Sequence, residues 1–161
     1  MAFDAYLKVP GVDGESRRKD FEKQIEILSF SLGAQSPTSI AAGGGRGSGY
    51  GPVSSLSFTK RSDVASAVLF QACCTGTQFA KATLTLRKVG GSRSVDVLRY
   101  EFENVSVESL NWAESSADND VPLEAVSFAF DKVTVTYTPQ TATGARGNAV
   151  VGSCDRRPLR V

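Results

Sequence analysis

Apolar and polar residues alternate with a period of two along most of this chain, whereas a helical period occurs in one stretch only. Gly, Pro or clustered polar residues bound the alternating segments, as is typical of strands joined by turns. The segments are residues 3–9, 25–32, 53–59, 83–88, 94–103 with a continuation through a bend to 110, 124–130, 133–138 and, more weakly, 149–151. The pattern predicts a mainly β fold, a small β-barrel or two-sheet sandwich of seven or eight strands flanked by one α-helix.

The predicted helix spans about residues 62–75. Ser62 is the expected N-cap, the charge of Asp63 suits the positive helix end, and Gly76 is the expected C-terminal stop. Two sides of this helix are apolar: a stripe of Val64, Ala65, Val68, Leu69, Ala72 and Cys73, and a patch of Ala67, Phe70 and Cys74. The stripe is expected to face the sheet. The patch needs a second cover, and our hypothesis is that a neighbouring subunit supplies it at Ala67, Phe70 and Cys74.

Two further segments are candidates for function. In the strand predicted at 25–32, Leu28, Phe30 and Leu32 share one side, and the other side carries Ser29 and Ser31, which are expected to face water. The glycine-rich stretch 36–53 is expected to be a long loop that protrudes from the domain and reaches a partner, because loops of this length inside a compact domain are usually functional or disordered.

Length, composition and charge narrow the class of protein. The 161 residues are expected to form one domain, 1–161, with the protruding loop at 36–53 and a C-terminal tail at 140–161. Eighteen basic and seventeen acidic residues give no general attraction to nucleic acid or to an anionic membrane. We find no apolar run long enough for a membrane span and no Sec-type signal peptide at the start, so any export would use another route.

The sequence offers no apparatus for catalysis or for a cofactor. It contains no histidine, which excludes Ser–His and Cys–His pairs and makes a zinc site improbable. The glycine-rich loop lacks both the GK[ST] and the GxGxxG pattern of phosphate loops. Cys73, Cys74 and Cys154 are expected as reduced thiols, since neighbouring cysteines pair only with strain. We therefore expect no enzyme, no cofactor and no metal, but a structural or binding protein.

Four stretches resemble the haemolysin-coregulated protein (Hcp) family, the tube component of bacterial type VI secretion. Their order and spacing match from the N-terminus to about residue 144. They are Lys8 to Ser16 (KVPGVDGES), the Gly43–Gly51 loop leading into Leu56–Gly76, Ala82 to Gly91 (ATLTLRKVGG), and Val133 to Gln140 (VTVTYTPQ). The sequence departs from the family pattern at Leu32, often an aromatic residue, and at Gly152-Ser153-Cys154, where Gly-Trp is common.

The resemblance implies a β-barrel with a flanking helix that assembles as a homohexamer, whose rings stack into a hollow tube. The strand with Ser29 and Ser31 would line the lumen and contact cargo effectors. The glycine-rich loop would reach the next ring through Ile40, Gly43, Gly44, Gly45, Arg46, Gly47 and Tyr50. The implied partners are further rings of itself, type VI effectors, and spike and sheath components, without nucleic acid or membrane insertion. The protein would assemble in the cytoplasm and then be secreted.

The residues alone leave other functions open. A monomeric β-barrel could bind a small ligand in its interior, and a sandwich could bind carbohydrate. The second alternative has little support, because Trp112 and four tyrosines offer a small stacking platform.

Overall fold

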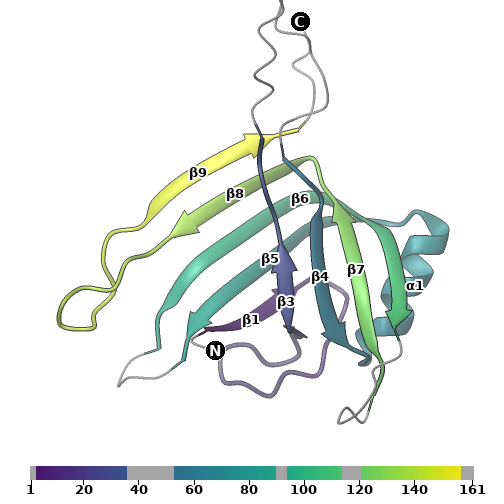
Figure 1. Ribbon diagram of the computed structural model, residues 1–161, viewed down its shortest axis with the longest axis horizontal. Coiled ribbons are helices and arrows are strands. Elements are labelled where there is room, and N and C mark those ends of the chain that lie inside the picture. The colour runs from purple at the N-terminus through teal and green to yellow at the C-terminus, as the bar shows by residue number, and fades with distance from the viewer. Residues whose placement is uncertain (1–2, 36–52, 90–93, 114–120, 157–161) are drawn as a thin grey trace, which may run out of the picture.

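The computed structural model describes residues 3–35, 53–89, 94–113 and 121–156. This part of the chain is mainly β with one short helix, as predicted, and it contains nine strands (Figure 1). In chain order the elements are β1 Phe3–Lys8, β2 Ile25–Ile27, β3 Ser29–Ser31, β4 Leu56–Arg61, α1 Ala65–Thr75, β5 Gln78–Lys88, β6 Asp96–Ala113, β7 Leu123–Ala129, β8 Lys132–Tyr137 and β9 Val150–Asp155.

The strands form one antiparallel sheet that curves around the core. Its hydrogen-bonded path runs β2-β1-β5-β6-β7-β4-β3, with β8 added to β6 and β9 added to β8. Among the described residues the sheet is not closed by hydrogen bonds, but its two ends, β2 and β3, are consecutive in the chain and only Leu28 lies between them. The single strand predicted at 25–32 is therefore wrong: its first half pairs with β1 and its second half with β4.

Strand β6 is long enough to serve two parts of the sheet. Its first half pairs with β5 and β8, and its second half pairs with β7. Between the halves Asn104 has φ 52°, and its side-chain amide donates to Asp131 Oδ2 at 2.9 Å. The predicted continuation through a bend is thus confirmed, and the strand reaches Ala113, so that Trp112 lies in the sheet.

The core lies between the inner face of the curved sheet and α1. Alternate residues of β4 and β7 point into it, and Phe58 and Phe128 meet there edge to face at 5.1 Å between ring centroids. From the helix, Leu69 and Ala72 are buried against the same cluster. The period-two alternation read from the sequence accounts for this packing.

The N-terminus of helix α1 differs from the prediction, whereas its C-terminus agrees with it. Val64 occupies the N-cap position without a capping side chain, and Ser62 is not the cap. Asp63 Oδ1 accepts from the backbone N–H of Ala65 at 2.9 Å, and Ser66 Oγ accepts from the N–H of Asp63 at 2.8 Å. The C-terminal stop at Gly76 is confirmed, with φ 66° and an N–H donated to the carbonyl of Ala72.

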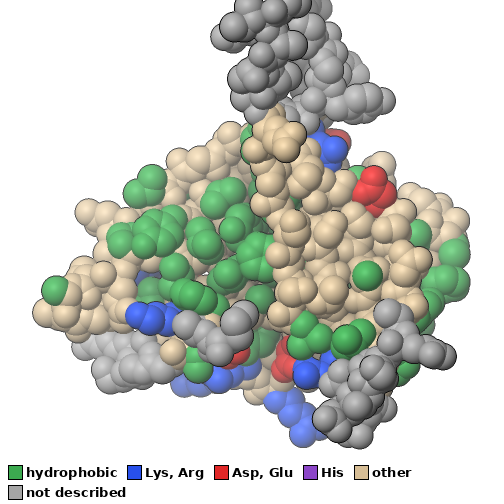
Figure 2. All heavy atoms as spheres, in the orientation of Figure 1, with side chains coloured by type: hydrophobic (Ala, Val, Ile, Leu, Met, Phe, Trp, Pro, Cys, Tyr) green, Lys and Arg blue, Asp and Glu red, His purple; other side chains and the backbone are tan. Residues whose placement is uncertain are grey.

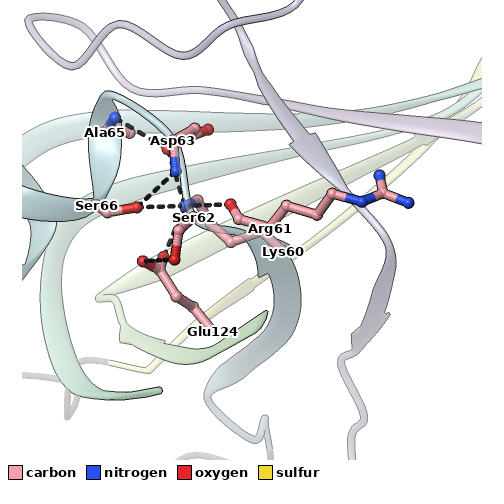
Figure 3. A network of polar contacts seen from close by, with 7 residues as sticks. All are labelled: Lys60, Arg61, Ser62, Asp63, Ala65, Ser66 and Glu124. Atoms are coloured by element: carbon pink, nitrogen blue, oxygen red, sulfur yellow. Dashed lines mark hydrogen bonds and ion pairs between the residues drawn. The ribbon is translucent and has the colours of Figure 1, made fainter. Parts of the chain in front are cut away.

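The buried side of α1 is rotated relative to the predicted stripe. Ser66 is buried together with Ala65, Leu69 and Ala72, while Val64 and Val68 are 57% and 44% exposed. The expectation that both valines face the sheet is therefore wrong. The cause is a polar network beneath the start of the helix that takes in the Ser66 hydroxyl (Figure 3).

An ion pair with no solvent exposure holds this network together (Figure 3). Lys60 on β4 and Glu124 on β7 are cross-strand neighbours, and Lys60 Nζ lies 2.7 Å from Glu124 Oε2. The ammonium group also lies 2.9 Å from Asp63 Oδ1 and donates to Ser66 Oγ at 3.1 Å. Ser62 Oγ donates to the second carboxylate oxygen of Glu124 at 3.0 Å. The buried charges are thus paired and hydrogen-bonded, as burial requires.

The network also determines the protonation of Glu124. Burial acts to raise the pKa of this carboxyl, but the hydrogen bonds from Lys60, Ser66 and Ser62 and the charge of Lys60 outweigh it and lower the pKa below its ordinary value. Glu124 is consequently a carboxylate at neutral pH, and its charge is stabilising in the folded state.

Removal of one partner should destabilise the fold severely. Glu124→Gln leaves the buried Lys60 ammonium with the Asp63 carboxylate, 2.9 Å away, as its remaining ion-pair partner in the described part of the chain. The loss of unfolding free energy should therefore stay below the about 3–5 kcal/mol typical of a buried charge left fully unpaired, but well above that of a surface pair. Glu101→Gln is the matched control, because it removes the exposed contacts of Glu101 with Lys81 at 3.6 Å and Arg99 at 3.3 Å, worth about 0–1 kcal/mol. Urea unfolding at one protein concentration checks this, and equal losses in the two variants would contradict it.

The lowered pKa of Glu124 predicts a pH dependence. The folded pKa lies below the unfolded value of about 4.5, so the stabilisation is complete above that pH and is lost as the pH falls through the folded pKa. Between pH 7 and about 5 this group adds no slope. Below about 4.5 the free energy of unfolding of Glu124→Gln should fall less steeply than that of the wild type, by up to about 1.4 kcal/mol per pH unit. Parallel acid limbs would refute this.

Candidate functional site

One outer face of the sheet is made of small polar side chains. It extends over β3, β4, β7 and the end of β6, and Figure 2 shows it as the tan area over β3, β4 and β7. We call it the serine face, and its members are Ser29, Ser31, Ser57, Thr59, Ser109, Asn111, Ala125 and Ser127. They surround a shallow depression of about 300 Å³.

Strand register brings these residues together from four distant segments. Ser31 lies opposite Ser57, Ser57 lies opposite Ser127, and Ser127 lies opposite Ser109. A bulge between Val107 and Ser109 makes the last pairing possible, because it leaves Val107 in the core and turns Ser109 to the outer face. Ser29 and Thr59 share a hydroxyl–hydroxyl hydrogen bond of 2.5 Å.

The serine face presents short polar side chains to solvent, and one carboxylate, that of Glu108, lies beside it and accepts a hydrogen bond from Ser127 Oγ at 3.2 Å. Ser29 and Ser31 are both exposed, and none of the eight side chains is ionisable. Short hydroxyl side chains can exchange hydrogen bonds with water or with a passing polypeptide without fixing either one. Sequence reasoning found Ser29 and Ser31 but missed the other six. The alternation Leu56-Ser57-Phe58-Thr59 and Ala125-Val126-Ser127 was the signal for most of them.

An apolar surface covers the outside of α1. Ala67, Phe70 and Cys74 are exposed, as their place opposite the stripe implied, and Val64 and Val68 lie beside them. Trp112 of β6 adds its ring, with its centroid 5.4 Å from that of Phe70, and these two aromatic side chains are 48% and 46% exposed. We call this surface the helix patch; its members are Val64, Ala67, Val68, Phe70, Cys74 and Trp112.

Clustered large apolar side chains on a surface mark an interaction site more often than scattered ones do. The strand predicted from the sequence ended at residue 110, so the contact of Trp112 with Phe70 was missed. The alternation of β6, continued past residue 110, could have placed it in a strand.

The residues expected to contact a neighbouring ring lie outside the described part of the chain. They are Ile40, Gly43, Gly44, Gly45, Arg46, Gly47 and Tyr50. The structure places only the base of their loop, where an isolated bridge pairs Ala34 with Val53 and Ser54 donates its N–H to the carbonyl of Gly33. Cys73, Cys74 and Cys154 are free thiols. The helix of the described part is neither long nor apolar enough to cross a membrane.

Comparison with known proteins places this geometry in a family. Residues 6–137 match the family model described as the type VI secretion system effector Hcp. Protein hcp1 of Pseudomonas aeruginosa is 36% identical over 151 residues, which cover 94% of this chain and 93% of that protein. The crystal structure of Hcp1 from Salmonella typhimurium has a TM-score of 0.78 at 27% identity and covers 96% of this chain and 95% of its own.

A further solved structure, described as a type six secretion system protein, has a TM-score of 0.83 at 33% identity, with 94% of this chain and 93% of its own covered. The family match spans most of the chain and includes the strands of the serine face and the helix that carries the helix patch. This chain therefore belongs to the Hcp family of type VI secretion proteins.

Proposed function

We propose that this chain is the tube subunit of a type VI secretion system, which forms hexameric rings that stack into a hollow tube and leave the cell with it. The helix patch carries the proposal. Phe70 and Trp112 place two half-exposed aromatic rings side by side on the outside of the molecule, where a contact with another copy would remove them from water. In the proposed ring, Ala67, Phe70 and Cys74 lie at the subunit interface.

The serine face is the proposed lumen wall. Its hydroxyl groups would exchange hydrogen bonds with a passing effector, with the Glu108 carboxylate beside Ser127, and Ser29 and Ser31 would contact that cargo. The segment with Ile40, Gly43, Gly44, Gly45, Arg46, Gly47 and Tyr50 is proposed to reach the adjacent ring. Effectors, spike and sheath components are the proposed partners, and transport is the proposed role in place of catalysis.

Phe70→Glu should break the ring, because it places an unpaired carboxylate in an apolar interface. Light scattering of the wild type at tens of micromolar should give about six times the 17.1 kDa of one chain, whereas the variant should give a much smaller mass. Val89→Glu is the matched control, since Val89 is 42% exposed and lies outside the helix patch. A wild-type monomer would contradict the proposed function, and a Phe70→Glu ring would remove the patch from the interface.

Ser31→Gln should leave the ring intact and weaken the capture of cargo, because a longer side chain then projects from the exposed side of β3 into the lumen. Ser94→Gln makes the same change at an exposed serine away from the serine face. Pull-down of a co-expressed type VI effector on purified rings measures the difference. Equal retention by both variants, or a Ser31→Gln chain that no longer folds, would rule out this role for Ser31.

A further inference from the structure

The buried side of α1 includes a hydroxyl group although apolar side chains beside it are left in water. Ser66 is buried, whereas Val64 and Val68 are exposed. At about 100° per residue, Ser66 forms one edge of the buried side and Val68 flanks the other edge. A small turn about the helix axis toward Val68 would bury more apolar surface and return Ser66 to water, which is normally the favourable exchange. The observed rotation therefore needs a specific cause.

Hydrogen bonds hold Ser66 in this buried position (Figure 3). Its Oγ accepts from Lys60 Nζ at 3.1 Å and from the backbone N–H of Asp63 at 2.8 Å. The ammonium group of Lys60 is fully buried, and it also donates to the carbonyl of Arg61 at 2.9 Å and pairs with Glu124 at 2.7 Å. Turning the helix would withdraw the hydroxyl from a buried charge, and the loss of a buried hydrogen-bond partner is costly.

Stability alone does not require an ion pair at this place. Lys60 and Glu124 continue the inward rows of β4 and β7, where Phe58 and Val126 are buried. Replacing a buried ion pair by apolar residues of similar volume is often neutral or stabilising, and in some proteins such a pair instead selects one arrangement of the chain. Here the arrangement that the pair selects is the rotation of α1.

That rotation determines how the helix patch is composed. It leaves Val64 and Val68 outward, and it sets the contact between Phe70 and Trp112, whose ring centroids lie 5.4 Å apart. Phe70 belongs to the helix and Trp112 to β6, so a turn of α1 changes their relative position. The same turn would remove Val68 from the outer surface.

We propose that Lys60, Glu124 and Ser66 are positioning residues for assembly, which hold α1 in the rotation that presents the helix patch to a second copy of this chain. The inference rests on the proposed function. It concerns how one chain presents its patch and makes no statement on the surface that receives it. With apolar residues in place of the pair, α1 is free to turn toward Val68, and only part of the population remains competent to assemble. The apparent affinity between copies falls by that fraction.

The double variant Lys60→Met, Glu124→Leu tests the proposal, because it removes both charges together and leaves no unpaired ion. Its rings should form at a concentration at least about tenfold above that of the wild type, as expected if about a tenth of the chains keep the competent rotation. The matched control is Lys81→Met, Glu101→Leu, the same changes at a pair 3.6 Å apart whose side chains are 52% and 32% exposed. The control should assemble as the wild type does. Sedimentation across a concentration series compares the three chains.

Two further measurements separate positioning from stability. Both use an Ala67→Glu background, which should be monomeric because the charge falls in the helix patch, while Phe70 and Trp112 are kept. A monomer is needed because assembly itself adds to apparent stability. In this background, the double substitution at the buried pair should leave the urea unfolding free energy equal or higher. It should also weaken the near-ultraviolet circular dichroism of Trp112, the single tryptophan of the chain, because its contact with Phe70 is no longer fixed.

Several results would overturn the inference. Rings of the double variant at the wild-type concentration, or equal damage in the control, would show that the pair does not position the patch. A double variant that is less stable or does not fold would assign the pair to stability, and an unchanged Trp112 spectrum would show that α1 does not turn. An Ala67→Glu ring would take the helix patch out of the interface. In each case a wild-type ring leaves the proposed function standing, whereas a wild-type monomer removes both.

Discussion

The buried ion pair between Lys60 and Glu124 is the constraint on which the rest of the structure depends. It joins β4 to β7 across the sheet, and the same ammonium group contacts Asp63 and Ser66 at the start of α1. Since α1 follows β4 after a few residues, one lysine fixes both the position of the helix and its rotation. A buried ion pair costs desolvation, and here further hydrogen bonds from Ser62 and to Ser66 offset that cost.

The rotation of α1 determines what the molecule presents to its surroundings. With Ser66 held inward, Val64 and Val68 are turned outward, where they join Phe70 and Trp112. A helix placed only to bury the most apolar surface would have hidden those two valines, as the sequence pattern predicted. The folded chain therefore exposes more apolar surface at α1 than its sequence requires. That excess is understandable if a second copy covers it.

Much of this fold could be predicted from the alternation of inward and outward residues along each strand. The errors arose where that alternation was not traced through the whole strand. The period-two pattern of apolar and polar residues correctly predicted most strand positions and the exposed serine side of β3. The Lys60–Glu124 pair was missed, although Lys60 continues the inward series of Leu56 and Phe58, and Glu124 has the parity of Val126. The division of 25–32 into β2 and β3 was also missed, although the alternation breaks there: the apolar positions are Ile25 and Ile27 and then Leu28 and Phe30, and the pairing partner changes at the same point.

The same alternation along β6 explains how one sheet carries both an apolar surface and a polar one. Leu98 and Tyr100 lie on the core-facing side of β6 together with Phe102, whereas Ser109 and Asn111 lie on the outer side of the same strand. The irregularities at Asn104 and before Ser109 each shift which residues of β6 face outward, and the two shifts cancel. The apolar side chains near β8 and the serine face are therefore on opposite sides of one sheet.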